Sequence, residues 1–161
     1  MSLENPLWQY ALTLYSRPGV EQCCLQLQDQ GAVVNRLLFA CWLASQGIRF
    51  DRDRLHQSDN RWQPEVTRPL RAVRFRVREQ LAALPEAEAC YRALRQAELA
   101  AEQLEFMLLW QQGQSWSPDS QVSEALFRHN LQQACGDRCS QATGALLLQL
   151  QSAAIVLVED D

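Results

Sequence analysis

The chain lacks the short motifs that mark most enzyme families. It has no glycine-rich phosphate loop, no Gly-x-Ser-x-Gly turn, no His-Glu-x-x-His helix and no run of close aspartates for a metal-bound diphosphate. Its only histidines, His56 and His129, have no nucleophile pattern beside them. These absences favour a non-enzymatic protein, and the sequence predicts no catalytic residue and no cofactor.

Signals for export, membrane insertion and zinc binding are also missing. The N-terminus has neither the basic segment nor the continuous apolar segment of a signal peptide, so we expect a cytoplasmic protein with six reduced cysteines. The apolar stretch 145–158 is interrupted by glutamines and is shorter than the roughly 20 residues of a membrane span. His129, Cys135 and Cys139 have an unfavourable ligand spacing and no Cys-x-x-Cys is present, so no metal is predicted.

Lysine is absent, and the 15 basic residues are all arginines. Residues 49–78 contain nine of them against four acids, so this segment carries +5 and the rest of the chain carries −9, for a total of −4. The nine are Arg49, Arg52, Arg54, Arg61, Arg68, Arg71, Arg74, Arg76 and Arg78. A recognisable nucleic-acid-binding motif and an overall basic charge are both missing, which makes nucleic acid an unlikely partner.

Apolar residues recur at helical spacing through most of the chain, which predicts an all-α, single-domain bundle of about six or seven helices. We expect a three-helix block over residues 1–47, a polar loop over 48–63, a long antiparallel helix hairpin over 64–112 and a helix pair over 113–161. Asn5-Pro6 begins the first helix, Gly47 ends the third, and Ser117-Pro118 begins the penultimate one. The break at Leu84-Pro85 is so short that its two helices must lie antiparallel.

Residues 32–45 form the most distinctive segment, because they are apolar around nearly the whole helix yet include Asn35 and Arg36. Such a helix is normally buried, and its polar groups then need partners. One interpretation is a pocket between helices. Its candidate residues are Glu21, Asp29, Asn35, Arg36 and Trp42. The other interpretation is structural, with the polar groups satisfied inside a sealed network.

The arginine-rich helix predicts a second candidate surface. Arg68, Arg71 and Arg78 lie opposite its apolar stripe, with Phe75 among them and Arg74 beside them. An aromatic ring among arginines suits an acidic protein partner, RNA or lipid phosphate.

An intramolecular alternative exists for the same arginines. Glu98, Glu102 and Glu105 form an acidic stripe on the following helix. Hairpin geometry places that stripe within reach of the arginines. Pairing inside the hairpin and binding of a protein partner both stay open on the sequence alone.

The first quarter of the chain resembles a known family. The block over residues 7–47 carries the patterns LW-x-YA-x-x-LY, PGVE, LQD-x-x-G and VN-x-LLF-x-x-WLA, which resemble a family of uncharacterised proteobacterial proteins. The resemblance implies a small all-α protein and brings no established activity, cofactor or catalytic residue. The matching residues are Trp8, Tyr10, Tyr15, Pro18, Gly19, Glu21, Asp29, Gly31, Asn35 and Trp42.

The leading functional hypothesis is an interaction or regulatory protein that binds a protein partner through the arginine-rich helix and the adjoining loop over residues 51–62. The alternative is a bundle that binds a small molecule or lipid, with or without catalysis, in a pocket near Asp29, Asn35 and Trp42. RNA binding is a weaker alternative. The apolar stripes of the hairpin also allow association with a second copy of the chain.

Overall fold

The computed structural model describes residues 2–57, 61–138 and 141–159. These residues form eight α-helices and three short helical turns, so the predicted all-α single domain is confirmed, with one or two more helices than expected. The elements are α1 (Pro6–Tyr15), α2 (Val20–Asp29), α3 (Val34–Ser45), α4 (Arg52–Gln57), η1 (Gln63–Thr67), α5 (Arg68–Gln80), η2 (Pro85–Ala87), α6 (Glu88–Gly113), α7 (Glu124–Cys135), η3 (Gly136–Arg138) and α8 (Gln141–Glu159).

Helix α3 is the centre of the fold. Every residue of it except Arg36 and Ser45 is buried, as its apolar circumference predicts. It packs against α1, α2, α6, α7 and α8. Gly113 at the end of α6 lies so close to α3 that a Cβ there would approach the rings of Trp42 and Phe39 to 3.0 and 3.1 Å.

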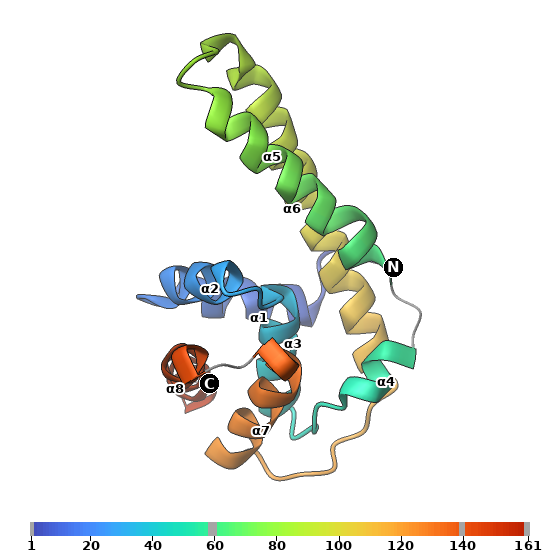
Figure 1. The fold of residues 1–161 in the computed structure, drawn as a ribbon. Coiled ribbons are helices and arrows are strands. Elements are labelled where there is room, and N and C mark those ends of the chain that lie inside the picture. Colours follow the sequence, from blue (N-terminus) through green and yellow to red (C-terminus); the bar gives the residue numbers. More distant parts are fainter. Residues whose placement is uncertain (1, 58–60, 139–140, 160–161) are drawn as a thin grey trace.

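The helix hairpin extends away from this body as an arm (Figure 1). We call residues 68–100 the hairpin arm. Helix α5 has no buried residue and packs mainly against α6 and the flanking turns. By contrast, the C-terminal half of α6 buries Phe106 and Leu109 in the core. The hairpin is therefore anchored at one end and exposed at the other.

The predicted start and end of the N-terminal block are confirmed by their capping contacts. The Asn5 side chain accepts a hydrogen bond from the Trp8 N–H at 3.0 Å, and Pro6 occupies the first turn of α1. Gly47 has φ +69°, and its carbonyl oxygen accepts hydrogen bonds from the backbone N–H groups of Asp119 and Ser120, each at 3.0 Å. A Cβ at Gly47 would lie 2.6 Å from the Ser120 carbonyl oxygen.

Two predicted boundaries are wrong. Helix α7 begins at Glu124 rather than at Ser117-Pro118, because Ser123 provides the N-cap and the preceding backbone is held against Gly47. The segment 48–63 is not wholly a loop, because it contains the short helix α4 and the start of η1. In α4 the Asp51 side chain accepts a hydrogen bond from the Arg54 N–H at 3.0 Å, a local cap that the sequence pattern did not reveal.

The wide π-helical turn η1 carries the chain into α5. The Arg68 N–H donates to the Gln63 carbonyl, one residue further back than in an α-helix. Pro69 follows directly and cannot donate to the carbonyl of Glu65, with which its ring would clash in a regular helix. The wide turn lets the helix continue through Pro69.

One buried amide joins three segments of the body. The Nδ2 atom of Asn130, on α7, donates to the carbonyl oxygens of Ala40 at 3.2 Å and Ile48 at 2.9 Å. Its Oδ1 atom accepts from the Phe50 N–H at 2.8 Å. The Asn130 side chain is fully buried, so it supplies hydrogen bonds to these backbone groups at a place that water does not reach. Asn130 thereby fixes the segment after α3 against α7.

We predict that Asn130→Leu lowers the free energy of unfolding by roughly 3–5 kcal/mol, because three buried backbone groups lose a partner at nearly constant volume. Urea denaturation measures the change. The control is Arg128→Ala, an exposed position on the same helix, which is expected to stay within about 0.5 kcal/mol of wild type. Equal stability of the two variants would contradict this role for Asn130.

Candidate functional site

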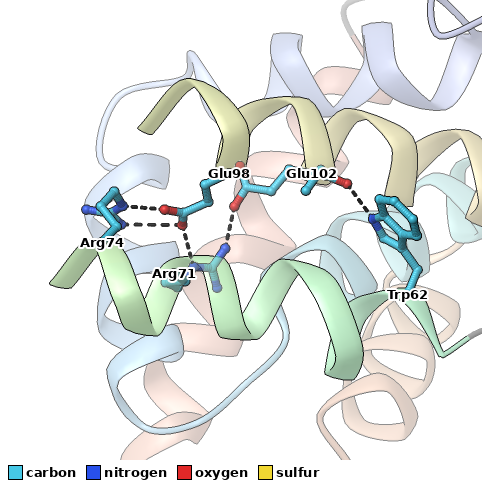
Figure 2. Close-up of polar contacts among 6 residues, drawn as sticks. Trp62, Arg71, Arg74, Glu98 and Glu102 are labelled. Atoms are coloured by element: carbon cyan, nitrogen blue, oxygen red, sulfur yellow. Dashed lines mark hydrogen bonds and ion pairs between the residues drawn. The ribbon is translucent and has the colours of Figure 1, made fainter. Parts of the chain in front are cut away.

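Charged residues gather where the hairpin arm meets the body (Figure 2). Arg71 and Arg74 are one turn apart on α5, and Glu98 and Glu102 are one turn apart on α6, so two pairs face each other across the hairpin. Arg71 Nε donates to Glu98 Oε1 at 2.7 Å, and its Nη2 donates to Glu102. Arg74 Nε donates to Glu98 Oε2. We call these four residues the arm network.

Burial and ion pairing act in opposite directions on the carboxyl groups of the arm network. Burial tends to raise the pKa of Glu98, but hydrogen bonds from Arg74 and Arg71 outweigh it, and the pKa lies below its usual value. For Glu102, burial prevails over the attraction of Arg71 and raises the pKa. Glu98 is therefore the acid whose charge holds both arginines.

The indole of Trp62 closes the base of the hairpin. Its Nε1 donates to the Ala101 carbonyl oxygen at 2.9 Å, which joins the residue before η1 to the middle of α6 (Figure 2). This contact and the arm network fix α5 relative to α6 from two neighbouring positions.

Glu105 lies one turn beyond Glu102 on α6 and is almost completely buried. Burial raises its pKa to about 7, and polar contact with Thr67 and Asn35 opposes that rise. Within the described part of the chain, Glu105 Oε2 and Thr67 Oγ1 have no partner in hydrogen-bonding geometry. Glu105 is thus a buried acid that is incompletely satisfied, which makes its surroundings a candidate for a functional site.

Two clefts flank the base of the arm. The basal cleft has a volume of about 710 Å³ and lies among the turn before α3, α4, η1, α5, α6 and the end of α7. Arg36, Arg68 and Glu105 are among its lining residues. A second cleft, of about 700 Å³, lies between the arm and the α1–α2 region and is lined by Tyr15, Arg92 and the arm network.

The structure divides the five residues proposed for partner binding. Arg71 and Arg74 belong to the arm network, with 18% and 15% of their side chains exposed. Phe75 is partly exposed, and two guanidinium groups lie over its ring, with Arg74 Cζ at 4.5 Å and Arg78 Cζ at 4.7 Å from the ring centroid. Arg68 and Arg78 are exposed.

The five residues proposed to line a pocket do not come together. Glu21 and Asp29 are exposed on α2. Asn35 is buried beside Glu105, and Arg36 is half-buried and lines the basal cleft. Trp42 lies two turns further along α3, buried with its ring stacked on Phe39 at a centroid distance of 6.1 Å.

Several residues at the basal cleft were not proposed from the sequence. Arg52 and Arg61 come from a segment without a clear periodic pattern, and nothing in their spacing links them to Arg36. Glu105 did appear as a member of the acidic stripe, but the stripe pattern does not distinguish its burial from that of Glu98 and Glu102.

The cysteines belong mainly to the core. Among the described residues, Cys23, Cys24, Cys41 and Cys135 are buried free thiols and Cys90 is an exposed one. Burial raises the pKa of Cys24 to about 12 and also raises that of Cys41, which suppresses thiolate chemistry there. Of the residues considered for zinc, Cys139 lies outside the described residues, and the described part of the chain holds no group of three metal-ligating side chains.

Among the described helices, none combines the length and the apolar character needed to cross a membrane.

The pKa of Glu105 generates a stability prediction. The folded state binds a proton here more tightly than the unfolded chain, so stability is lost as the pH rises from about 4.5 to about 7. Glu105→Gln removes this loss, and we expect its advantage over wild type to grow by about 3 kcal/mol between about pH 4.5 and pH 8. Chemical denaturation across this range measures it. Glu79→Gln, an exposed position on α5, is the matched control and is expected to show no comparable gain.

The arm network generates a second prediction. Arg71→Ala leaves Glu98 with one of its two arginines and removes the arginine contact of Glu102. We expect a loss of about 2–4 kcal/mol, whereas Arg76→Ala, an exposed position on the same helix, should change stability by less than about 0.5 kcal/mol. Thermal and urea unfolding test this, and equal effects would show that the network contributes nothing to folding.

Comparisons with known proteins give one family and no close relative of known activity. A search of curated proteins found no match. A search of solved structures also found none. The model of the family described as "Protein of unknown function (DUF2390)" matches residues 6–109, which run from the start of α1 to the buried part of α6. The chain therefore belongs to this family of proteins of unknown function.

Proposed function

We propose that this chain is a non-enzymatic, cytoplasmic bacterial interaction protein that binds an acidic segment of a partner protein through the hairpin arm. The observation that carries the proposal is the exposed α5, which extends from the body (Figure 1) and has no buried residue. It also carries an aromatic ring in contact with two arginines. Arginine and aromatic side chains are the residue types enriched in the centres of protein interfaces.

The proposed surface is a stripe made of Arg68, Phe75 and Arg78. Positions 68, 75 and 78 lie on one side of α5 because they are separated by seven and three residues. Among the described residues, Arg68 and Arg78 form no ion pair, so their charge is available to an acidic group. Arg71 and Arg74 support the stripe from inside the hairpin instead of contacting the partner directly.

Two side chains of the segment over residues 51–62, which the sequence also suggested for partner binding, make contacts inside the fold. The Arg54 guanidinium lies 5.0 Å from the Trp116 ring centroid and donates to the Ser115 carbonyl. Trp62 donates to Ala101. Both side chains are used inside the fold, so the proposal is restricted to the stripe on α5.

Buried cysteines support the cytoplasmic part of the proposal. Among the described residues five cysteines are free, and four of these are packed in the core as small apolar side chains. A reducing compartment suits such a set of thiols.

The test compares Phe75→Ala/Arg78→Gln with Val73→Ala/Arg76→Gln, a control pair of exposed or partly exposed positions on another side of α5. Proteins captured from a lysate of the source organism are quantified, and the affinity of the purified partner is then measured by titration. We expect the stripe variant to bind at least about tenfold more weakly than wild type, and the control pair to bind normally.

Other outcomes would overturn the proposal. A captured set that disappears on nuclease treatment would favour RNA binding. A dimer of the wild-type chain that becomes monomeric in the stripe variant would make the stripe a contact between two copies. Equal affinity of both variants for the purified partner, or capture of no protein, would contradict an arm-mediated partner directly.

A further inference from the structure

The basal cleft is large enough for a small molecule and is assembled from segments far apart in the chain. Its volume of about 710 Å³ lies within the range of ligand sites. Ala32, Leu55 and Leu109 contribute apolar wall, and Glu105 forms part of the lining contributed by α6. Part of any ligand in this cleft therefore contacts apolar side chains.

Five arginines line the basal cleft. They are Arg36 of α3, Arg52 of α4, Arg61 before η1, and Arg68 and Arg71 of α5. The described acids that line it are Glu105 and Asp137. Guanidinium groups present their donors in a planar fork that matches the oxygens of phosphate and carboxylate. The charge of the lining therefore favours an anionic ligand over a neutral or cationic one.

The arginines differ in how far the protein itself uses them. Arg52 pairs with Asp137 at 3.3 Å and lies over Gly136, where a Cβ would come within 2.9 Å of its guanidinium. Arg71 is shared with the arm network. Arg68 forms no ion pair with the described residues. It is exposed, lies at the start of α5 and lines the cleft. Arg68 is accordingly the side chain most available to a ligand.

Glu105 is an acid in the lining of the basal cleft, but its raised pKa limits the negative charge that it contributes. Burial raises its pKa to about 7, so it is only partly ionised at neutral pH. The five arginines also outnumber Glu105 and Asp137 in the lining, so the charge of the cleft stays positive. A permanently neutral side chain at the same position should favour an anion further.

We propose that the basal cleft binds a small organic phosphate, with Arg36 and Arg68 holding the phosphate and the apolar wall contacting the rest of the molecule. Phosphate is favoured over a single carboxylate because arginines converge on the cleft from several segments, and phosphate offers more oxygens and more charge to them. This site shares Arg68 with the stripe, but Phe75 and Arg78 lie outside its lining, and the proposal does not depend on the protein partner.

Isothermal titration tests the proposal with four probes: inorganic phosphate, glycerol 3-phosphate, AMP and the uncharged nucleoside adenosine. We expect saturable binding of AMP and glycerol 3-phosphate, weaker binding of inorganic phosphate and none of adenosine. Arg68→Gln and Arg36→Gln should each weaken binding about tenfold or more, since each removes a charge-assisted contact. Arg76→Gln, exposed on α5 and outside the lining, is the control and should bind as wild type.

Glu105→Gln gives the measurement that a merely structural role would not produce. At about pH 8 it should strengthen AMP binding by several-fold, because it removes negative charge from the lining. Absence of saturable phosphate binding would overturn the proposal, as would equal binding of adenosine and AMP. Equal weakening by Arg68→Gln and Arg76→Gln would also overturn it, because it would indicate non-specific attraction. Phe75→Ala/Arg78→Gln should leave AMP binding unchanged, so the two proposals fail independently.

Discussion

The requirement to cover α3 on all sides dominates the structure. A helix that is apolar around its circumference cannot face water on any side, so five other helices pack around it. Asn35, the polar exception among its buried residues, lies on the side where Glu105 of α6 approaches. The packing of α6 on α3 thus places the buried acid Glu105 at the base of the arm.

Because the apolar surface is concentrated in the body, the hairpin arm depends on a different kind of contact. Its apolar side chains are only partly buried between α5 and α6. The arm network adds charge-assisted hydrogen bonds where the arm leaves the body, and Trp62 adds one more contact at that level (Figure 2). All four charged residues line the second cleft, and Arg71 lines the basal cleft as well. The residues that hold the arm therefore also contribute to its candidate binding sites.

The sequence predicted the parts of the fold that local chemistry determines. Asn5-Pro6 and Gly47 act on the helices next to them, and α1 begins and α3 ends beside them as predicted. The break at Leu84-Pro85 lies between the two hairpin helices as predicted, although α5 already ends at Gln80. The predicted start of α7 was wrong because the loop before this helix is held by hydrogen bonds to Gly47, some 70 residues earlier in the chain.

The candidate site was less predictable for a related reason. The charge pattern left two uses open for the arginines of α5, and only the packing of α5 on α6 assigns Arg71 and Arg74 to Glu98 and Glu102. The basal cleft combines Arg36, Arg68 and Glu105, whose proximity follows from how three helices pack and has no periodic signature.

Gly113 has a geometric consequence for the whole arm. Its missing side chain lets the end of α6 rest directly on the rings of Phe39 and Trp42, so the spacing at this contact affects the tilt of the whole helix. A 26-residue helix is about 39 Å long, and a tilt of about 10° at this contact would carry its far end through roughly 7 Å. The close approach that Gly113 allows is therefore one of the contacts that set the direction of the arm, together with the packing of Phe106 and Leu109 in the core.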